Sequence, residues 1–274
     1  MSVSFAEIRQ NDGHIPLEGL PNTRDLGGLP TKAGRRIAPR LLLRSGTLAS
    51  ATQHDIMILK DKYKVSRVID LRTDAERANR PDPKDAFPGT QFVNIPLLRA
   101  KALGVTLDES ESLSEAVKAI AATANERMLR IYRQMMLDKY TQKSFKRFFD
   151  ELVHHGEGAV LWHCAVGKDR VGMATVLLLS ALDIPDDLIV QDYLATNRFM
   201  EPLAQKMLDD LSPYGLSHGL RESVRMLNTV DRQFLQAGLD AVNAEYGSLD
   251  AFIRKELDVT EEKKGALRKN YLID

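Results

Sequence analysis

The sequence predicts a single α/β domain, with a mainly parallel sheet of four or five strands and helices on both faces. Short apolar runs of strand length alternate along the chain with longer segments in which apolar residues recur every three or four positions. Strands that alternate with helices form parallel sheets covered by helices on both sides. From their length and flanking turns, the expected strands are 41–43, 67–71, 91–95 and 159–162.

The longer segments have the spacing of helices. In the segment 52–63, Ile56 and Leu59 fall on one side, which predicts a helix with one buried face. The segment 171–182 is apolar throughout, as expected of a helix buried in the interior. The same spacing predicts further helices over 127–137, 141–153 and 185–197.

We expect one domain that spans residues 1–274. Helical insertions are expected at about 100–140, within a stretch whose pattern is helical, and at 198–230, where polar and apolar residues are mixed. Pro202 and Pro213 should interrupt the second of them, since proline breaks the backbone hydrogen bonding of a helix.

The composition limits the classes of function. The chain has 274 residues, with 38 Lys and Arg balanced by 38 Asp and Glu, so any affinity for nucleic acid, anionic membrane or phosphate would have to be local. A single cysteine excludes an internal disulfide and suits a reducing compartment. Residues 1–10 lack the apolar core of a signal peptide, and no stretch approaches 18 apolar residues. We therefore expect a cytoplasmic protein without a membrane span, although export by a non-standard route would leave no such trace.

The stretch from Val160 to Thr175 is the centre of the predicted site. An apolar strand leads into it and an apolar helix follows, so Cys164 to Arg170 should form the turn between them. A helix begins with free backbone N–H groups and partial positive charge, which together form an anion-binding site. The only cysteine of the chain lies at the mouth of this turn.

The neighbours of Cys164 suit a thiolate that attacks a phosphate ester. Thiols ionise more readily at a helix start beside cationic side chains, and His163, Lys168 and Arg170 are close in sequence. The Cys-x5-Arg spacing lets the loop curl so that its N–H groups and the Arg170 guanidinium surround the oxygens of a dianion. Gly167 supplies the freedom of φ that such a loop often requires. A phosphate monoester fits this cup.

Two other interpretations of the stretch are weaker. A lone cysteine is often a small buried apolar residue, but here strand, cysteine, glycine, arginine and helix follow in order. The nucleotide-binding pattern G-x-x-x-x-G-K-[ST] would need Gly at position 162 and Ser or Thr at position 169, where this chain has Trp162 and Asp169.

The motif His163-Cys164-x5-Arg170 resembles the signature of the cysteine-dependent tyrosine and dual-specificity phosphatases. Its fuller form, H-C-x-x-G-K-D-R-x-G, is similar to that of the bacterial and fungal branch often called atypical or triple-specificity tyrosine phosphatases. Three further segments, 22–28, 70–72 and 192–197, also fit this branch, so the likeness covers nearly the whole chain. The resemblance implies one phosphatase domain with the three-layer sandwich of tyrosine phosphatases and a phosphate-binding P-loop.

The resemblance also implies hydrolysis of phosphate monoesters without a metal or a cofactor. Cys164 would attack phosphorus to give a phosphocysteine intermediate, while Arg170 and the loop amides hold the phosphate oxygens. The substrate-binding residues would be Ala165, Val166, Gly167 and Lys168.

Two carboxyl groups compete for the role of general acid. Asp169 lies inside the loop, as in this phosphatase branch, whereas Asp74 lies on a separate loop, as the movable acid does in other tyrosine phosphatases. We expect Asp169 to act. In the same segment as Asp74, Arg72 and Glu76 are expected to form a structural ion pair. His163 is a further candidate acid or supporting group.

Residues near the chain start and inside the loop bear on the site and its substrate. By resemblance, Arg24 and Asp25 should lie behind the loop. A cation at the position of Lys168 also occurs in phosphoinositide phosphatases, so activity on both phosphotyrosine and phosphoinositides is expected, with phosphotyrosine first. Val171 replaces the Thr or Ser usual after the loop arginine, which predicts slow hydrolysis of the intermediate.

Three alternative functions stay open at this point. The main substrate could be a phosphoinositide, or the chain could be a slow, phosphate-binding pseudophosphatase. A rhodanese-like sulfurtransferase also uses a loop cysteine before a helix, but the run Lys168-Asp169-Arg170 fits phosphatases better.

Overall fold

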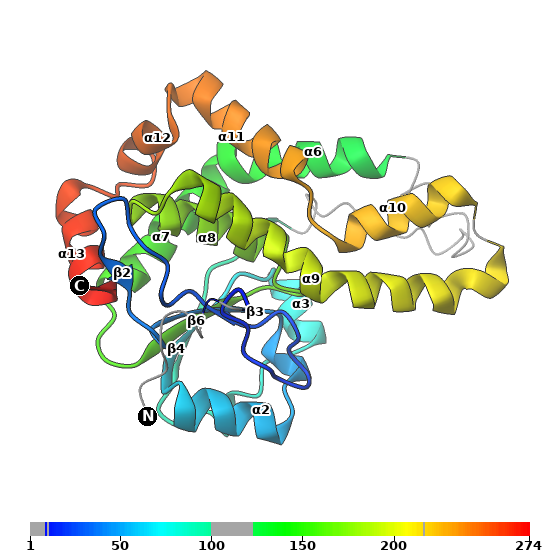
Figure 1. The fold of residues 1–274 in the computed structure, drawn as a ribbon, viewed down its shortest axis with the longest axis horizontal. Coiled ribbons are helices and arrows are strands. Elements are labelled where there is room, and N and C mark those ends of the chain that lie inside the picture. Colours follow the sequence, from blue (N-terminus) through cyan, green and yellow to red (C-terminus); the bar gives the residue numbers. More distant parts are fainter. Residues whose placement is uncertain (1–8, 10, 100–122, 216) are drawn as a thin grey trace.

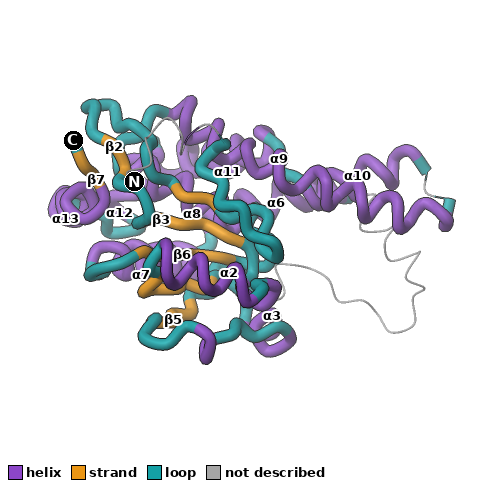
Figure 2. The backbone as a smooth tube through the Cα atoms, turned by 60° about the horizontal axis from the view of Figure 1, so that its bottom comes forward, coloured by secondary structure: helices purple, strands orange, loops and turns teal. Residues whose placement is uncertain are grey.

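The computed structural model describes residues 9, 11–99, 123–215 and 217–274. Its centre is a five-stranded sheet in the order β1-β3-β6-β4-β5 (Figure 2). The strands are β1 (Arg24–Asp25), β3 (Leu42–Ser45), β4 (Val65–Asp70), β5 (Gln91–Asn94) and β6 (Ala159–His163). β1 is antiparallel to β3, and the other three pairings are parallel. The predicted fold class, a mainly parallel sheet of four or five strands, is confirmed.

The helices surround this sheet (Figure 1). They are α2 (Gln53–Met57), α3 (Asp74–Asn79), α6 (Ala124–Leu137), α7 (Lys139–Val153), α8 (Asp169–Ala181), α9 (Asp186–Leu211), α10 (His218–Asn228), α11 (Arg232–Tyr246), α12 (Leu249–Lys255) and α13 (Glu261–Tyr271). α2 continues into a π-helical turn, Ile58–Lys62. The helix predicted over 52–63 is therefore present, with an α-helical first part and a π-helical second part. A small antiparallel pair joins β2 (Arg36–Ile37) to β7 (Leu272–Ile273) near the C-terminus.

Alternating side chains on the strands build two separate cores. On one face of the sheet, Leu43 and Leu161 pack with Ile56 of α2. On the other face, Val160 and Trp162 join the apolar residues of α7 and α8 in the larger core. Because strand side chains alternate between faces, this arrangement gives the three layers of helix, sheet and helix that the sequence predicts.

The prediction that Pro202 interrupts the helix after residue 185 is wrong. α9 runs without a break from Asp186 to Leu211, and only the short turn Ser212–Tyr214 ends it. A proline costs a helix one hydrogen bond, but the rest of the ladder and the packing of α9 against α10 can outweigh that loss.

The end of α9 and α10 project from the body of the molecule (Figure 1). They cover most of the stretch 198–230, whose status as an insertion stays a prediction. Residues 100–122 of the other expected insertion lie outside the described residues, and α6 covers most of its remainder. No helix in the described ranges is long and apolar enough to cross a membrane.

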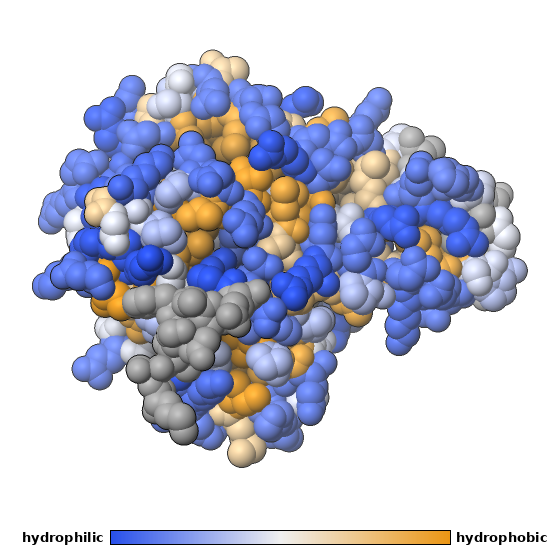
Figure 3. All heavy atoms as spheres, in the orientation of Figure 1, coloured by the Kyte–Doolittle hydropathy of each residue, from blue (hydrophilic) through white to orange (hydrophobic). Residues whose placement is uncertain are grey.

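A hollow of about 520 Å³ opens between α8, α9, α11 and α12. Apolar side chains gather over these elements on the face seen in Figure 3. The hollow lies behind the body of α8 rather than at its first turn, where Asp169 and Arg170 begin the helix.

The register of the parallel strands brings three loops together. Ser45 and Asp70 are both paired with His163, so β3, β4 and β6 end side by side. In open α/β sheets, ligands bind outside the carboxyl ends of the strands. The turn 46–50, the segment 71–73 and the loop after His163 therefore meet at the edge where a site is expected.

Candidate active site

The loop between β6 and α8 encloses the thiol. Cys164 is 2% exposed, at the carboxyl end of a fully buried strand. Gly167 has φ +74°, and a Cβ there would lie 2.6 Å from the carbonyl oxygen of Ser45. Within the described part of the chain, the backbone N–H groups of 165–168 donate to no side chain or carbonyl. Unpaired N–H groups of consecutive residues at the start of a helix, around a thiol, form a receptor for an anion.

Arg170, at the start of α8, is held by a carboxylate from another element. Its Nη1 and Nη2 each donate to Glu76 of α3 at 2.7 Å, a bidentate pair. Burial alone would lower the pKa of the guanidinium, but the negative charges of the Cys164 thiolate and of Glu76 raise it. Arginine has five N–H donors, so two bonds to Glu76 leave three for an incoming oxyanion.

The expected ion pair between Arg72 and Glu76 is wrong. Arg72 pairs with Asp70 and Asp82, at 2.8 and 3.0 Å, and it is 2% exposed. The helix α3 begins after its N-cap residue Thr73, so Arg72 and Glu76 do not share a helical face. Glu76 is therefore free to reach the catalytic loop.

Asp169 is tied to a chain of buried hydroxyl groups. The hydroxyl of Tyr132 in α6 donates to its Oδ1 at 2.7 Å, and the hydroxyl of Tyr193 in α9 donates to Tyr132 at 2.8 Å. Lys168 lies 3.1 Å from Asp169 Oδ2 and also donates to the carbonyl of Thr229. Burial, followed by the charge of Asp169, raises the pKa of Tyr132 well above its ordinary value. Tyr132 thus stays protonated and keeps donating to the carboxylate.

Asp74 has a different environment from Asp169. It is the first residue of α3, its side chain is 84% exposed, and its charge is paired with Arg77 at 3.2 Å. Two residues further on, Glu76 is the acidic side chain of this helix that contacts the loop.

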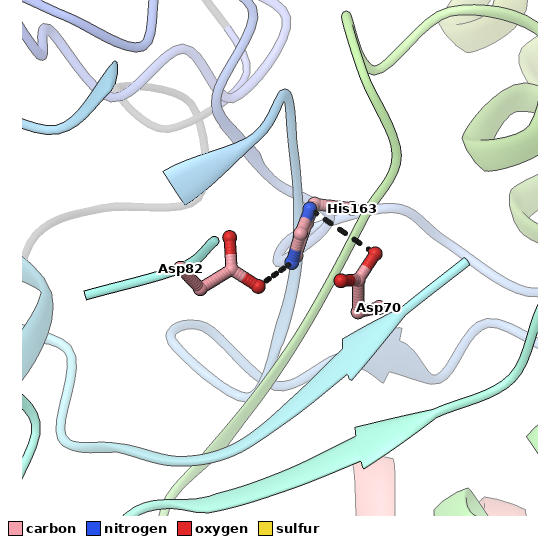
Figure 4. A group of neighbouring side chains, drawn as sticks. All are labelled: Asp70, Asp82 and His163. Atoms are coloured by element: carbon pink, nitrogen blue, oxygen red, sulfur yellow. Dashed lines mark hydrogen bonds and ion pairs between the residues drawn. The ribbon is translucent and has the colours of Figure 1, made fainter. Parts of the chain in front are cut away.

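His163 connects the loop to two acidic residues (Figure 4). Its Nε2 lies 3.1 Å from Asp82 Oδ2, and its Nδ1 lies 3.2 Å from the carbonyl oxygen of Cys164. Both ring nitrogens face oxygen acceptors, so only the protonated ring can donate to both. Burial would raise the pKa of Asp82, but the hydrogen bond and charge of His163 lower it, with Arg72.

The same three residues have the donor types of a metal site. Ligand atoms of Asp70, Asp82 and His163 lie within 4.8 Å of one another. The guanidinium of Arg72, however, already contacts both carboxylates. A divalent cation would have to displace this buried cation, so the donor set does not fit a resident metal well.

Behind the loop, a buried charge network supports its backbone. Arg44 on β3 donates to the carbonyl of Gly167 at 3.0 Å and to Asp192 at 2.7 Å. Arg24 on β1 pairs with the same Asp192, at 3.1 Å, and all three side chains are at most 1% exposed. Burial would raise the pKa of Asp192, but the two arginine charges lower it. Asn22 adds a hydrogen bond to Gly167 at 2.9 Å.

The structure places the two N-terminal candidates differently. Arg24 lies behind the loop and is linked to it through Asp192 and Arg44, which donates to the carbonyl of Gly167. Of the two candidates for a supporting position, Asp25 is the one whose carboxylate turns elsewhere, since it accepts from the backbone N–H groups of Gly27 and Arg40. It orders the turn after β1 instead.

Several contacts to the loop could not be found from the sequence. Glu76, Tyr132, Arg44 and Asn22 reach it from distant parts of the chain, and none of them lies at a local spacing that points to it. For Asn22 and Asp192 the sequence does give an indication of a role near the site, because both lie in segments that resemble the phosphatase branch.

The sequence is similar to proteins that are named phosphatases. A protein of Cupriavidus necator, assigned by name to the tyrosine-protein phosphatases, is 30% identical over 261 residues, 94% of this chain and 88% of its own. The triple specificity protein phosphatase PtpB of Mycobacterium tuberculosis is 28% identical over 260 residues, 87% of this chain and 92% of its own. A solved structure of the core catalytic domain of the PP-IP phosphatase SIW14 from S. cerevisiae covers 78% of this chain and 87% of its own, at 13% identity and a TM-score of 0.37. The sequence model of a group described as the tyrosine phosphatase family matches residues 15–273. The chain therefore belongs to the tyrosine phosphatase family.

Proposed function

We propose that the protein hydrolyses phosphotyrosine in polypeptides through a phosphocysteine intermediate formed on Cys164. The observation that carries the proposal is the loop itself, where free N–H groups and the guanidinium of Arg170 surround a buried thiol. The family relationship supports the reaction class, and the curated relatives are named tyrosine and triple specificity phosphatases.

The first step is an in-line displacement. The thiolate sulfur of Cys164 forms a bond to phosphorus while the bond from phosphorus to the tyrosine oxygen breaks. Arg170 and the amides of 165–168 hold the three equatorial oxygens, where negative charge is spread in the transition state. In the second step, water attacks phosphorus, the thiolate leaves and inorganic phosphate is released.

The leaving phenolate needs a proton, which we assign to Asp169. The residue begins α8 directly after the loop, so covalent geometry keeps it close to the bound phosphate. Asp74, in contrast, is exposed and paired with Arg77. The pH–rate profiles of Asp169→Asn and Asp74→Asn test the assignment, because loss of the basic limb in the Asp74 variant alone would contradict it.

The environment of Lys168 favours phosphotyrosine over a phosphoinositide as the main substrate. A multiply phosphorylated head group would need a free cation beside the cup. Lys168 is 5% exposed, and its ammonium already contacts Asp169 and the carbonyl of Thr229. Lys168 therefore stabilises the loop and the carboxylate of Asp169 instead. A location in the cytoplasm, where the thiol stays reduced, is part of the same proposal.

Initial rates of the wild type and of Cys164→Ser, measured with EDTA present, test the proposal. The substrates are p-nitrophenyl phosphate, a phosphotyrosine peptide, a phosphoserine peptide and a soluble phosphoinositide. We expect turnover that EDTA leaves intact, that Cys164→Ser abolishes and that is fastest for the phosphotyrosine peptide. Phosphate binding without turnover on all four substrates would indicate a pseudophosphatase, and consumption of cyanide with thiosulfate would indicate a sulfurtransferase.

A further inference from the structure

A second hollow, of about 330 Å³, lies beside the catalytic loop. Five parts of the chain line it: the segment 18–22, the turn from Gly46 to Ser50, Arg80 at the end of α3, the loop residues Ala165 and Val166, and α9. The larger apolar side chains in this lining are Leu20, Pro21, Val166, Met200 and Leu203.

Apolar surface is concentrated around this hollow. Val166 and Leu203 are 44% and 45% exposed, and Met207, one turn beyond Leu203 on α9, is 43% exposed. In the described ranges, three other large apolar side chains are exposed, and they belong to other elements. Large apolar side chains are normally buried, so neighbouring exposed ones beside a polar site indicate a surface that a ligand covers.

We propose that this hollow is a substrate subsite that takes an apolar side chain next to the phosphotyrosine of a polypeptide. The inference rests on the function proposed above. Ala165 and Val166 border the hollow and directly follow Cys164. A polypeptide whose phosphate lies in the cup therefore passes the mouth of the hollow, and neighbouring residues along an extended chain are only about 3.5 Å apart.

The size and charge of the hollow favour a polypeptide over a lipid. Its volume suits one or two side chains, whereas a pair of acyl chains needs far more space. Glu18 and Arg80 both line it, together with the hydroxyl residues Thr47 and Ser50. This mixture offers donors and acceptors to peptide groups, and a chain of zero net charge has no general attraction to an anionic membrane.

The subsite is tested with a set of phosphotyrosine peptides. In these peptides, each of the three positions before and the three after the phosphotyrosine carries Leu, Asp or Lys in turn. To separate peptide binding from chemistry at the cup, kcat/KM for each peptide is divided by kcat/KM of the same enzyme for p-nitrophenyl phosphate. For the wild type we expect one position at which Leu exceeds Asp by about tenfold, the range for one apolar contact. In Leu203→Asp the preference for Leu at that position should vanish, and the Lys peptide should gain at least threefold.

Ile273→Asp is the matched control, because Ile273 is also exposed, at 40%, but lies on β7 at the C-terminus. It should keep the wild-type preference. If Leu203→Asp does not fold, as judged by circular dichroism, Leu203→Ser replaces it, with the preference expected to fall at least threefold.

Two results would overturn the subsite while the proposed function survives. One is a wild type that cleaves the peptides without preference at any position, and the other is a preference that persists in the Leu203 variants. Turnover of the phosphoinositide but of no peptide would refute both the subsite and phosphotyrosine as the substrate in the proposed function. Inactivity of the wild type on every substrate, p-nitrophenyl phosphate included, would instead refute the proposed function and the subsite with it.

Discussion

The bidentate pair between Glu76 and Arg170 leads to the most specific prediction. Glu76→Gln keeps the shape of the side chain and one acceptor oxygen, but it removes the charge and one of two hydrogen bonds of 2.7 Å. The guanidinium of Arg170 then loses its fixed orientation beside Cys164. Its positive charge also loses its partner, so attraction for phosphate should not weaken.

The size of the effect follows from the contacts. Hydrogen bonds to charged groups contribute about 1.5 to 3 kcal/mol each, and a small displacement of a catalytic group can lower the rate by about 100-fold. We expect kcat on p-nitrophenyl phosphate to fall by about 10- to 100-fold, with KM and the inhibition constant of inorganic phosphate unchanged or lower. This pattern separates misorientation of Arg170 from loss of phosphate binding.

The same pair should make stability depend on pH. Burial would raise the pKa of Glu76, but the hydrogen bonds and charge of Arg170 lower it from 4.5 to about 2. Such a shift corresponds to about 3 kcal/mol, which solvent screening at a side chain 25% exposed reduces to about 1 to 2 kcal/mol. Because the folded-state pKa is depressed, this stability is present above pH 4.5 and is lost as the pH falls toward 2. Urea unfolding should therefore show the largest difference between wild type and Glu76→Gln near neutral pH.

Glu151→Gln is the control for both measurements. Glu151 pairs with Arg67 at 3.1 Å and is 28% exposed, close to the value for Glu76. It belongs to α7, and in the described part of the chain it makes no hydrogen bond or ion pair with the loop. Its variant should keep kcat within twofold. Our reasoning about Arg170 would be refuted if kcat of Glu76→Gln also stayed within twofold of the wild type.

Three further changes test the surroundings of the loop. Tyr132→Phe removes a hydrogen-bond donor to the carboxylate of Asp169. The basic limb of the pH–rate profile should then move to higher pH by about one to two units, and a limb that does not move would argue against Asp169 as the acid. Asp192→Asn leaves the buried guanidinium groups of Arg24 and Arg44 without a counter-charge. The free energy of unfolding, measured in urea, should fall by about 3 to 5 kcal/mol, and a loss below about 1 kcal/mol would contradict the network. Val171→Thr should raise the steady-state rate and reduce the pre-steady-state burst of product, while equal bursts would show that hydrolysis of the intermediate does not limit the wild type.

The elements built from local patterns were predictable from the sequence. The segment 159–182 contains an apolar strand, a turn and an apolar helix in succession, and the structure has β6, the loop and α8 in the same places. The uninterrupted course of α9 through Pro202 was not predictable, because tertiary packing can outweigh the cost of one missing hydrogen bond. Nor does the spacing of 52–63 distinguish an α-helical turn from the π-helical turn that follows Met57.

The site could be predicted only where its residues are close in sequence. Cys164 and Arg170 belong to one motif, and their loop was recognisable from the residue types alone. The sequence suggests that Glu76 pairs with Arg72, four residues away, whereas in the structure it pairs with Arg170, 94 residues away. The contact of Tyr132 with the loop likewise depends on how α6 packs, which no local pattern specifies.

Rapid chemical quench of the enzyme with a ³²P-labelled phosphotyrosine peptide tests the central claim most directly. We predict that denatured wild-type protein carries up to one covalent phosphate per chain, located by proteolysis in the peptide that contains Cys164, and that Cys164→Ser carries none and turns over no substrate. Turnover retained by Cys164→Ser, or label on a different residue, would contradict the account.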